Sequence, residues 1–110
     1  MAYDESLAQR LRAIFAGRDD IVERKMFGGL AFLRSGHMCC GVIGGELMAR
    51  VGPDQYQAAL QQPHARQMDF TGRPLTGFIY VGCDGIRSDK ALESWVRRCE
   101  ALVDSLPDKA

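Results

Sequence analysis

The sequence lacks the features that mark membrane proteins, secreted proteins and strongly charged proteins. No apolar run approaches the roughly 20 residues that a membrane-spanning helix requires, and the first residues are polar and acidic, unlike a signal peptide. The 14 basic and 14 acidic side chains cancel, so no overall charge draws the chain to nucleic acid or to anionic membranes. We therefore expect a cytoplasmic protein that has no membrane contact and does not bind nucleic acid directly.

The sequence also lacks the motifs of common cofactor and metal sites. No pair of cysteines has the C-x₂₋₄-C spacing that structural zinc sites usually show. Gly28-Gly29 precedes an apolar strand and has no Lys-Ser/Thr ending, so it is not a phosphate-binding loop. Cytosolic cysteines stay reduced, and we expect no disulfide framework from the four cysteines present. We expect no metal, no cofactor and no catalytic residue set.

The first half of the chain predicts a helix followed by a series of hairpins. Apolar residues within positions 4–16 recur at helical spacing and Gly17 follows them, which is typical of an amphipathic helix with a glycine stop. Two turns that contain glycine, Ser35-Gly36 and Gly44-Gly45, separate apolar runs and predict hairpins. The expected strands cover residues 21–26, 30–34, 37–43 and 46–51.

The second half predicts a short helix, a strand and a long helix. A proline suited to a first helical turn opens the helix expected over residues 53–61. Residues 64–77 are expected to be irregular, and residues 78–81 have strong β propensity. Ser88 is expected to cap the final helix. The fold class is therefore α+β, with an antiparallel sheet and helices packed on one face in two layers, in a single domain over residues 1–110.

The tight turns also predict which residues lie under the helices, because a two-residue loop fixes the register of a hairpin. In this register Leu33 lies opposite Met38, and Ala31 lies opposite Cys40. One face of the sheet then carries no charged side chain and is assigned to the core. Its predicted members are Ala31, Leu33, Met38, Cys40, Val42, Leu47, Ala49 and Val51.

The opposite face is predicted to be an apolar strip with a charged rim, which is typical of a protein–protein or ligand surface. Three alternatives remain open for this strip. Residues 64–77 fold over it, a second copy of the chain covers it, or it forms a groove for a small molecule. The candidate binding residues on this face are Phe32, Cys39, Ile43, Met48 and Arg50.

Several motifs together resemble the TfoX N-terminal domain family over about residues 7–106. They are Lys25-Met26-Phe27-Gly28-Gly29-Leu30, Gly36-His37-Met38, Met68-Asp69-Phe70 and Gly77-Phe78-Ile79-Tyr80-Val81. The resemblance implies a two-layer α+β domain similar to secretion-chaperone-like folds, which often associate as dimers. It also implies a link to transcriptional or competence regulation and no established reaction. The competence regulator of the family has a second, carboxy-terminal helical domain that we do not expect here, so its role is not carried over.

The leading hypothesis is a non-catalytic interaction or regulatory domain, a homodimer that contacts a protein partner in transcriptional regulation. The alternative is a small-molecule-binding or thiol-dependent enzyme that uses Cys39. The predicted register places Cys39 opposite Arg50 and near His37, and both neighbours would lower the pKa of the thiol. A third hypothesis, direct binding to DNA, is opposed by the balanced charge.

Overall fold

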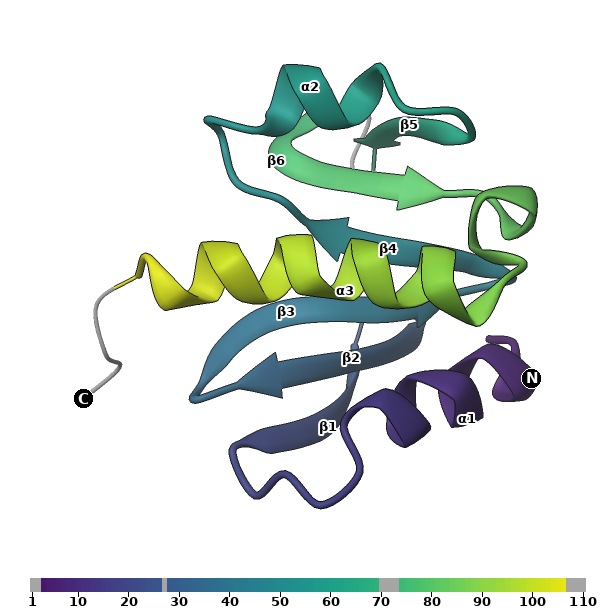
Figure 1. Cartoon of the computed structure of the whole chain (residues 1–110), viewed down its shortest axis with the longest axis vertical. Coiled ribbons are helices and arrows are strands. Elements are labelled where there is room, and N and C mark those ends of the chain that lie inside the picture. The colour runs from purple at the N-terminus through teal and green to yellow at the C-terminus, as the bar shows by residue number, and fades with distance from the viewer. Residues whose placement is uncertain (1–2, 27, 70–73, 107–110) are drawn as a thin grey trace.

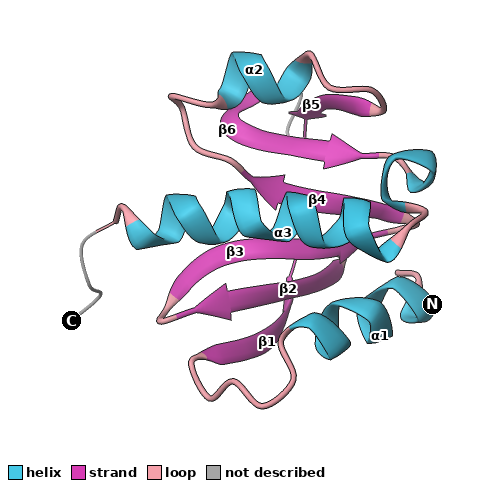
Figure 2. Ribbon diagram, in the orientation of Figure 1, coloured by secondary structure: helices cyan, strands magenta, loops and turns pink. Residues whose placement is uncertain are grey.

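The structure is a computed structural model that describes residues 3–26, 28–69 and 74–106. One antiparallel sheet has the strand order β1-β2-β3-β4-β6-β5, and helices pack in front of it (Figure 1, Figure 2). This architecture confirms the predicted α+β class. The strands are β1 (Ile21–Met26), β2 (Gly29–Arg34), β3 (His37–Ile43), β4 (Glu46–Arg50), β5 (Ala65–Asp69) and β6 (Pro74–Val81). The helices are α1 (Glu5–Ile14), α2 (Tyr56–Leu60) and α3 (Asp89–Asp104), and a short 3₁₀ helix covers Cys83–Ile86.

Side-chain caps begin the two longer helices, as polar residues before an apolar stripe predict. An Asp4 carboxylate oxygen accepts a hydrogen bond from the backbone N–H of Ser6 at 2.9 Å. The Ser88 hydroxyl accepts from the backbone N–H of Ala91 at 3.1 Å, as predicted for the start of α3. None of the helices in the described ranges combines the length and the apolarity that crossing a bilayer requires.

A single hydrophobic core joins all three helices to one face of the sheet. Leu11 of α1, Tyr56 of α2 and Val96 of α3 pack in the same cluster as Val42 of β3 and Ile79 of β6. Helix α3 runs across β3 and β4 (Figure 1). The helices therefore lie on one face, as predicted, and the other face of the sheet carries a separate cluster.

The pairing of β2 with β3 corrects the predicted register. The Ser35-Gly36 loop is confirmed, with positive φ at both residues, and it pairs Leu33 with Met38. Beyond that pair the register shifts, and Phe32 pairs with Cys40 while Ala31 pairs with Gly41. Cys39 is the extra residue of a β-bulge.

The bulge reverses the faces of β2 and of the β3 residues that precede Cys40, because side chains alternate along a strand. Leu30 and Phe32 lie under the helices, whereas Ala31, Leu33 and Met38 do not, contrary to the prediction. From Cys40 onward the predicted faces hold, since Cys40 pairs with Ala49 and Val42 with Leu47.

The segment predicted to be irregular contains strand structure. Residues Ala65–Asp69 form β5, and β6 begins at Pro74 rather than at Phe78. Pro74 is the first residue of its strand, a position where a proline, which has no N–H, does not remove a hydrogen bond from the ladder. Pairing with the next strand, β6, thus overrides weak local propensity in β5. Of the motif residues, Phe27 and Phe70 lie outside the described residues.

Gly41 is required for space, because Met48 lies over it on the helix-free face. A Cβ at Gly41 would come within 2.7 Å of the Leu30 carbonyl oxygen and 3.1 Å of the Met48 Cε. We expect Gly41→Ala to destabilise the fold by about 1–3 kcal/mol through overpacking. In the control Gly45→Ala, the added Cβ meets nothing within 4 Å, and we expect a change within about 0.5 kcal/mol. Urea unfolding measures both, and equal stabilities would contradict this packing.

Candidate functional site

Phe32, a predicted interface residue, is part of the core. Its side chain is 1% exposed, and its ring centroid lies 5.6 Å from that of Phe15 on the loop that follows α1. The prediction that Phe32 lies on the surface opposite the helices is therefore wrong. The β-bulge is the cause, because it turns Phe32 to the face that α1 and α3 cover.

Cys39 is also buried on the helix-covered side. It has no exposed surface and belongs to the main core together with Cys40 and with Cys99 of α3. The ladder between β3 and β4 ends at the pair of Cys40 with Ala49 and does not include a pair of Cys39 with Arg50, and both consecutive cysteines pack in the core. A thiol in this position has no surface at which a substrate could meet it.

Hydrogen bonds within the three-thiol cluster, Cys39, Cys40 and Cys99, favour one thiolate. The Cys40 and Cys99 thiols both act on Cys39, and the positive charges of Arg34 and Arg18 add to the effect. These contacts lower the pKa of Cys39 well below its ordinary value, although burial opposes the shift. The same contacts raise the pKa of Cys40 and that of Cys99, with burial adding to both. The cluster is a hydrogen-bonded part of the core.

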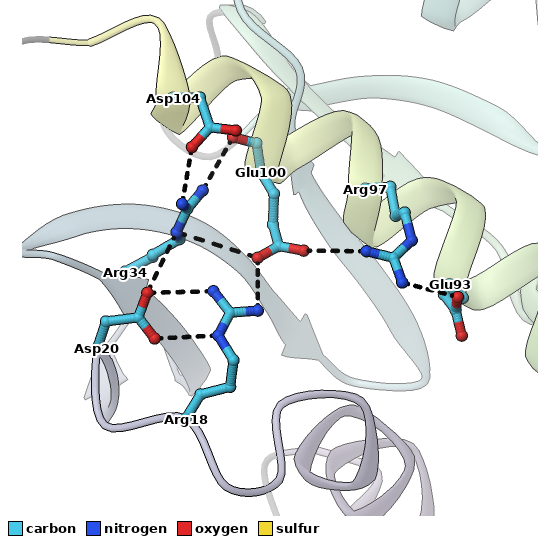
Figure 3. A network of polar contacts seen from close by, with 7 residues as sticks. All are labelled: Arg18, Asp20, Arg34, Glu93, Arg97, Glu100 and Asp104. Carbon is cyan, nitrogen blue, oxygen red and sulfur yellow. Dashed lines mark hydrogen bonds and ion pairs between the residues drawn. The ribbon is translucent and has the colours of Figure 1, made fainter.

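A network of ion pairs lies beside this cluster and joins three distant segments (Figure 3). Glu100 of α3 lies 2.9 Å from an Arg18 nitrogen and 3.9 Å from an Arg97 nitrogen. Arg34 at the end of β2 pairs with Asp104 at 2.7 Å. The Arg34 guanidinium also donates to the Glu100 backbone carbonyl at 3.2 Å.

Asp20 closes the network at the turn before β1. Both of its carboxylate oxygens accept from Arg18, at 3.1 Å each, and Arg34 approaches one of them at 3.4 Å. The Arg18 contact lowers the pKa of the Asp20 carboxyl below its ordinary value. Sequence reasoning missed this network, since its charges lie as far apart in the sequence as Arg18 and Asp104. The pair of Arg97 with Glu93 at 3.0 Å is local, because the two residues lie four positions apart on α3.

The helix-free face of the sheet carries a second, smaller apolar cluster. Met48, Met68 and Tyr80 are almost fully buried there. The partly buried side chains packed against them are Met38, Ile43 and Phe78. Met68 comes from β5, which extends the sheet beside β6 and does not fold over this face.

Two arginines border this cluster. The Arg50 guanidinium lies 5.6 Å from the Phe78 ring centroid and donates to the Met38 carbonyl at 3.2 Å. The Arg66 guanidinium lies 4.5 Å from the Tyr80 ring centroid and forms an ion pair with Glu46. Of the predicted binding residues, the structure therefore brings Ile43, Met48 and Arg50 together on the helix-free face.

The described residues hold no group of three or more His, Cys, Asp or Glu side chains arranged to bind a metal ion. The fold and the two clusters define a small α+β domain with one helix-covered face. The model of the TfoX N-terminal domain family matches residues 13–102. The chain belongs to this family. No curated protein and no solved structure matches it.

Glu100 should be the carboxylate on which the ion-pair network depends most. Its side chain is 13% exposed, against 50% for Glu93. We expect Glu100→Gln to destabilise the protein by about 1–2 kcal/mol, because it removes the least exposed carboxylate that faces Arg18 and Arg34. Asp20 and Asp104 then remain to pair with these arginines. The control Glu93→Gln should cost less than about 0.5 kcal/mol. Urea unfolding at neutral pH separates the two, and equal losses would contradict the central place of Glu100.

The thiols should divide into one reactive and three protected groups. Cys83 is exposed, whereas the other three are buried. We expect iodoacetamide to modify Cys83 first in the native protein, and the others at least roughly a hundredfold more slowly, through opening of the fold. Mass spectrometry of timed samples locates the label. A Cys83→Ser variant in which Cys39 still reacted rapidly would restore the thiol-dependent hypothesis.

Proposed function

We propose that this chain is a non-catalytic interaction domain that associates with a second copy of itself through the helix-free face of its sheet. The observation that carries the proposal is the apolar cluster on that face. Met38, Ile43 and Phe78 remain partly exposed around a buried centre. A partner that covered them would remove apolar surface from water, which favours association.

The rim of this cluster supports a protein partner rather than a small ligand. Arg50 and Arg66 stack on Phe78 and Tyr80, and arginine and aromatic side chains are enriched among the residues that contribute most to binding at protein interfaces. Their guanidinium groups are also suited to hydrogen bonds with carbonyls and carboxylates of a partner.

Membership in the TfoX N-terminal domain family supports a regulatory role for this association. In this proposal the paired chains contact a further protein in transcriptional regulation, inside the cytoplasm. The full burial of Cys39 argues against the alternative of a thiol-dependent enzyme, because the nucleophile would have to meet its substrate inside the core.

Charged substitutions at partly exposed positions of the cluster test the proposed association. Light scattering over a dilution series should give twice the chain mass of 12.2 kDa for the parent protein. We expect Ile43→Glu and Phe78→Glu to weaken the dimer at least about tenfold, since each would bury an unpaired carboxylate.

The control is Ala58→Glu on the exposed side of α2, which should leave the dimer unchanged. Circular dichroism and thermal melting establish that each variant is folded. A parent protein that is monomeric at every concentration, or cluster variants that dimerise as the parent does, would refute this interface.

A further inference from the structure

A cavity lies on the helix-covered side, away from the cluster on the helix-free face. It has a volume of about 350 Å³ and is lined by residues of the loop after α2, of the 3₁₀ helix and of α3. The side chains that line it include His64, Asp84, Trp95 and Arg98. A volume of this size is within the range of small-molecule sites.

His64 reaches the cavity wall from a tight turn. Its φ is +69°, in the left-handed region that favours glycine. The Ala65 N–H donates to the Gln62 carbonyl at 3.3 Å, which makes Pro63 and His64 the two central residues of a β-turn. Positive φ at the second central residue, after a proline, is the pattern of a type II turn, so this turn fixes where the His64 side chain points.

Gly85 makes room for the His64 side chain. A Cβ at Gly85 would come within 2.9 Å of the His64 Cβ and 2.8 Å of Val81 Cγ1. The φ of Gly85 is not positive, so glycine is required here for space and not for its torsion angles. The backbone of His64 is fixed as well, since its carbonyl accepts from the Gly82 N–H at 2.9 Å.

Arg98 supplies an uncompensated positive charge. Its guanidinium lies 5.0 Å from the Trp95 ring centroid, and in the described part of the chain no carboxylate pairs with it. The adjacent Arg97 differs, because it pairs with both Glu93 and Glu100. A guanidinium held on an aromatic ring keeps its N–H donors directed at a ligand at small entropic cost.

The one unpaired guanidinium among the described residues of the wall matches a ligand with a single negative charge. Asp84 is paired with Arg87, so it does not neutralise Arg98. The remaining wall includes the apolar Pro63 and Ala91. We propose that the cavity between α3 and the 3₁₀ helix binds a small organic monocarboxylate. Its carboxylate pairs with Arg98, and its apolar body lies against Pro63, Ala91 and Trp95.

The single tryptophan of the chain reports on this site directly. Trp95 is the only tryptophan, so its indole N–H gives one NMR signal. Titration of the full chain with sodium benzoate should shift that signal saturably. Benzamide, a neutral compound of nearly the same shape, should bind at least tenfold more weakly. An absence of saturation with benzoate, equal binding of benzamide, or tighter binding of inorganic phosphate overturns the proposal.

Three variants connect the affinity to the residues named. Arg98→Gln should weaken benzoate binding at least tenfold, while Arg97→Gln on the same helix should not change it. His64→Gly should melt no lower than the parent, because glycine accepts the backbone torsion, and yet bind benzoate more weakly. If Arg98→Gln or His64→Gly binds benzoate as the parent does, the assignment of the site is wrong.

Discussion

The β-bulge at Cys39 is the constraint on which the rest of the structure depends. One extra residue in β3 decides that Phe32 and Cys40 lie opposite each other and face the helices. Without it, Phe32 would be on the surface and Ala31 would be in the core. The larger side chain is the one that fills the space beneath α1 and α3, where Phe15 meets it. The volume of the core therefore selects the bulged register over the regular one.

The bulge also determines which side chains of the sheet contact α3. Two consecutive cysteines point toward the helix and pack against Cys99, so the contact is buried and consists of small side chains that hydrogen-bond to one another. Arg34, at the end of the neighbouring strand, reaches over this contact to Asp104 and to the Glu100 carbonyl. Burial of the apolar stripe of α3 supplies most of the free energy, at about 25 cal/mol per Å². The ion pairs contribute less, but they determine how far α3 can slide or rotate on the sheet, because each has a defined partner.

The features that sequence reasoning predicted are those with local causes. The Ser35-Gly36 turn, the cap at Ser88 and the apolar stripes depend on neighbours within a few residues, and the structure confirms them. The bulge has no such signal. Every residue near it is apolar, so hydrophobic alternation cannot decide between Cys39 and Cys40 as the inward side chain.

The features that sequence reasoning missed depend on contacts outside the segment concerned. Strand β5 has weak propensity of its own and forms by pairing with the following strand, β6. Glu100 contacts Arg18, which lies 82 positions away in the chain. The bulge also explains why some candidate binding residues lie on the predicted face and others do not. Ile43, Met48 and Arg50 lie after the bulge, where the predicted alternation holds, whereas Phe32 and Cys39 lie within its reach.

The β5–β6 hairpin physically joins the two proposed sites. The Arg66 guanidinium stacks on the Tyr80 ring on the helix-free face. The next residue, Val81, packs beside Gly85 at the cavity. His64 immediately precedes β5, and its carbonyl accepts a hydrogen bond from the N–H of Gly82, the residue that follows β6. A change in the twist of this hairpin would therefore move the walls of both sites together. If occupation of one site alters that twist, linkage requires each site to change the affinity of the other by the same factor.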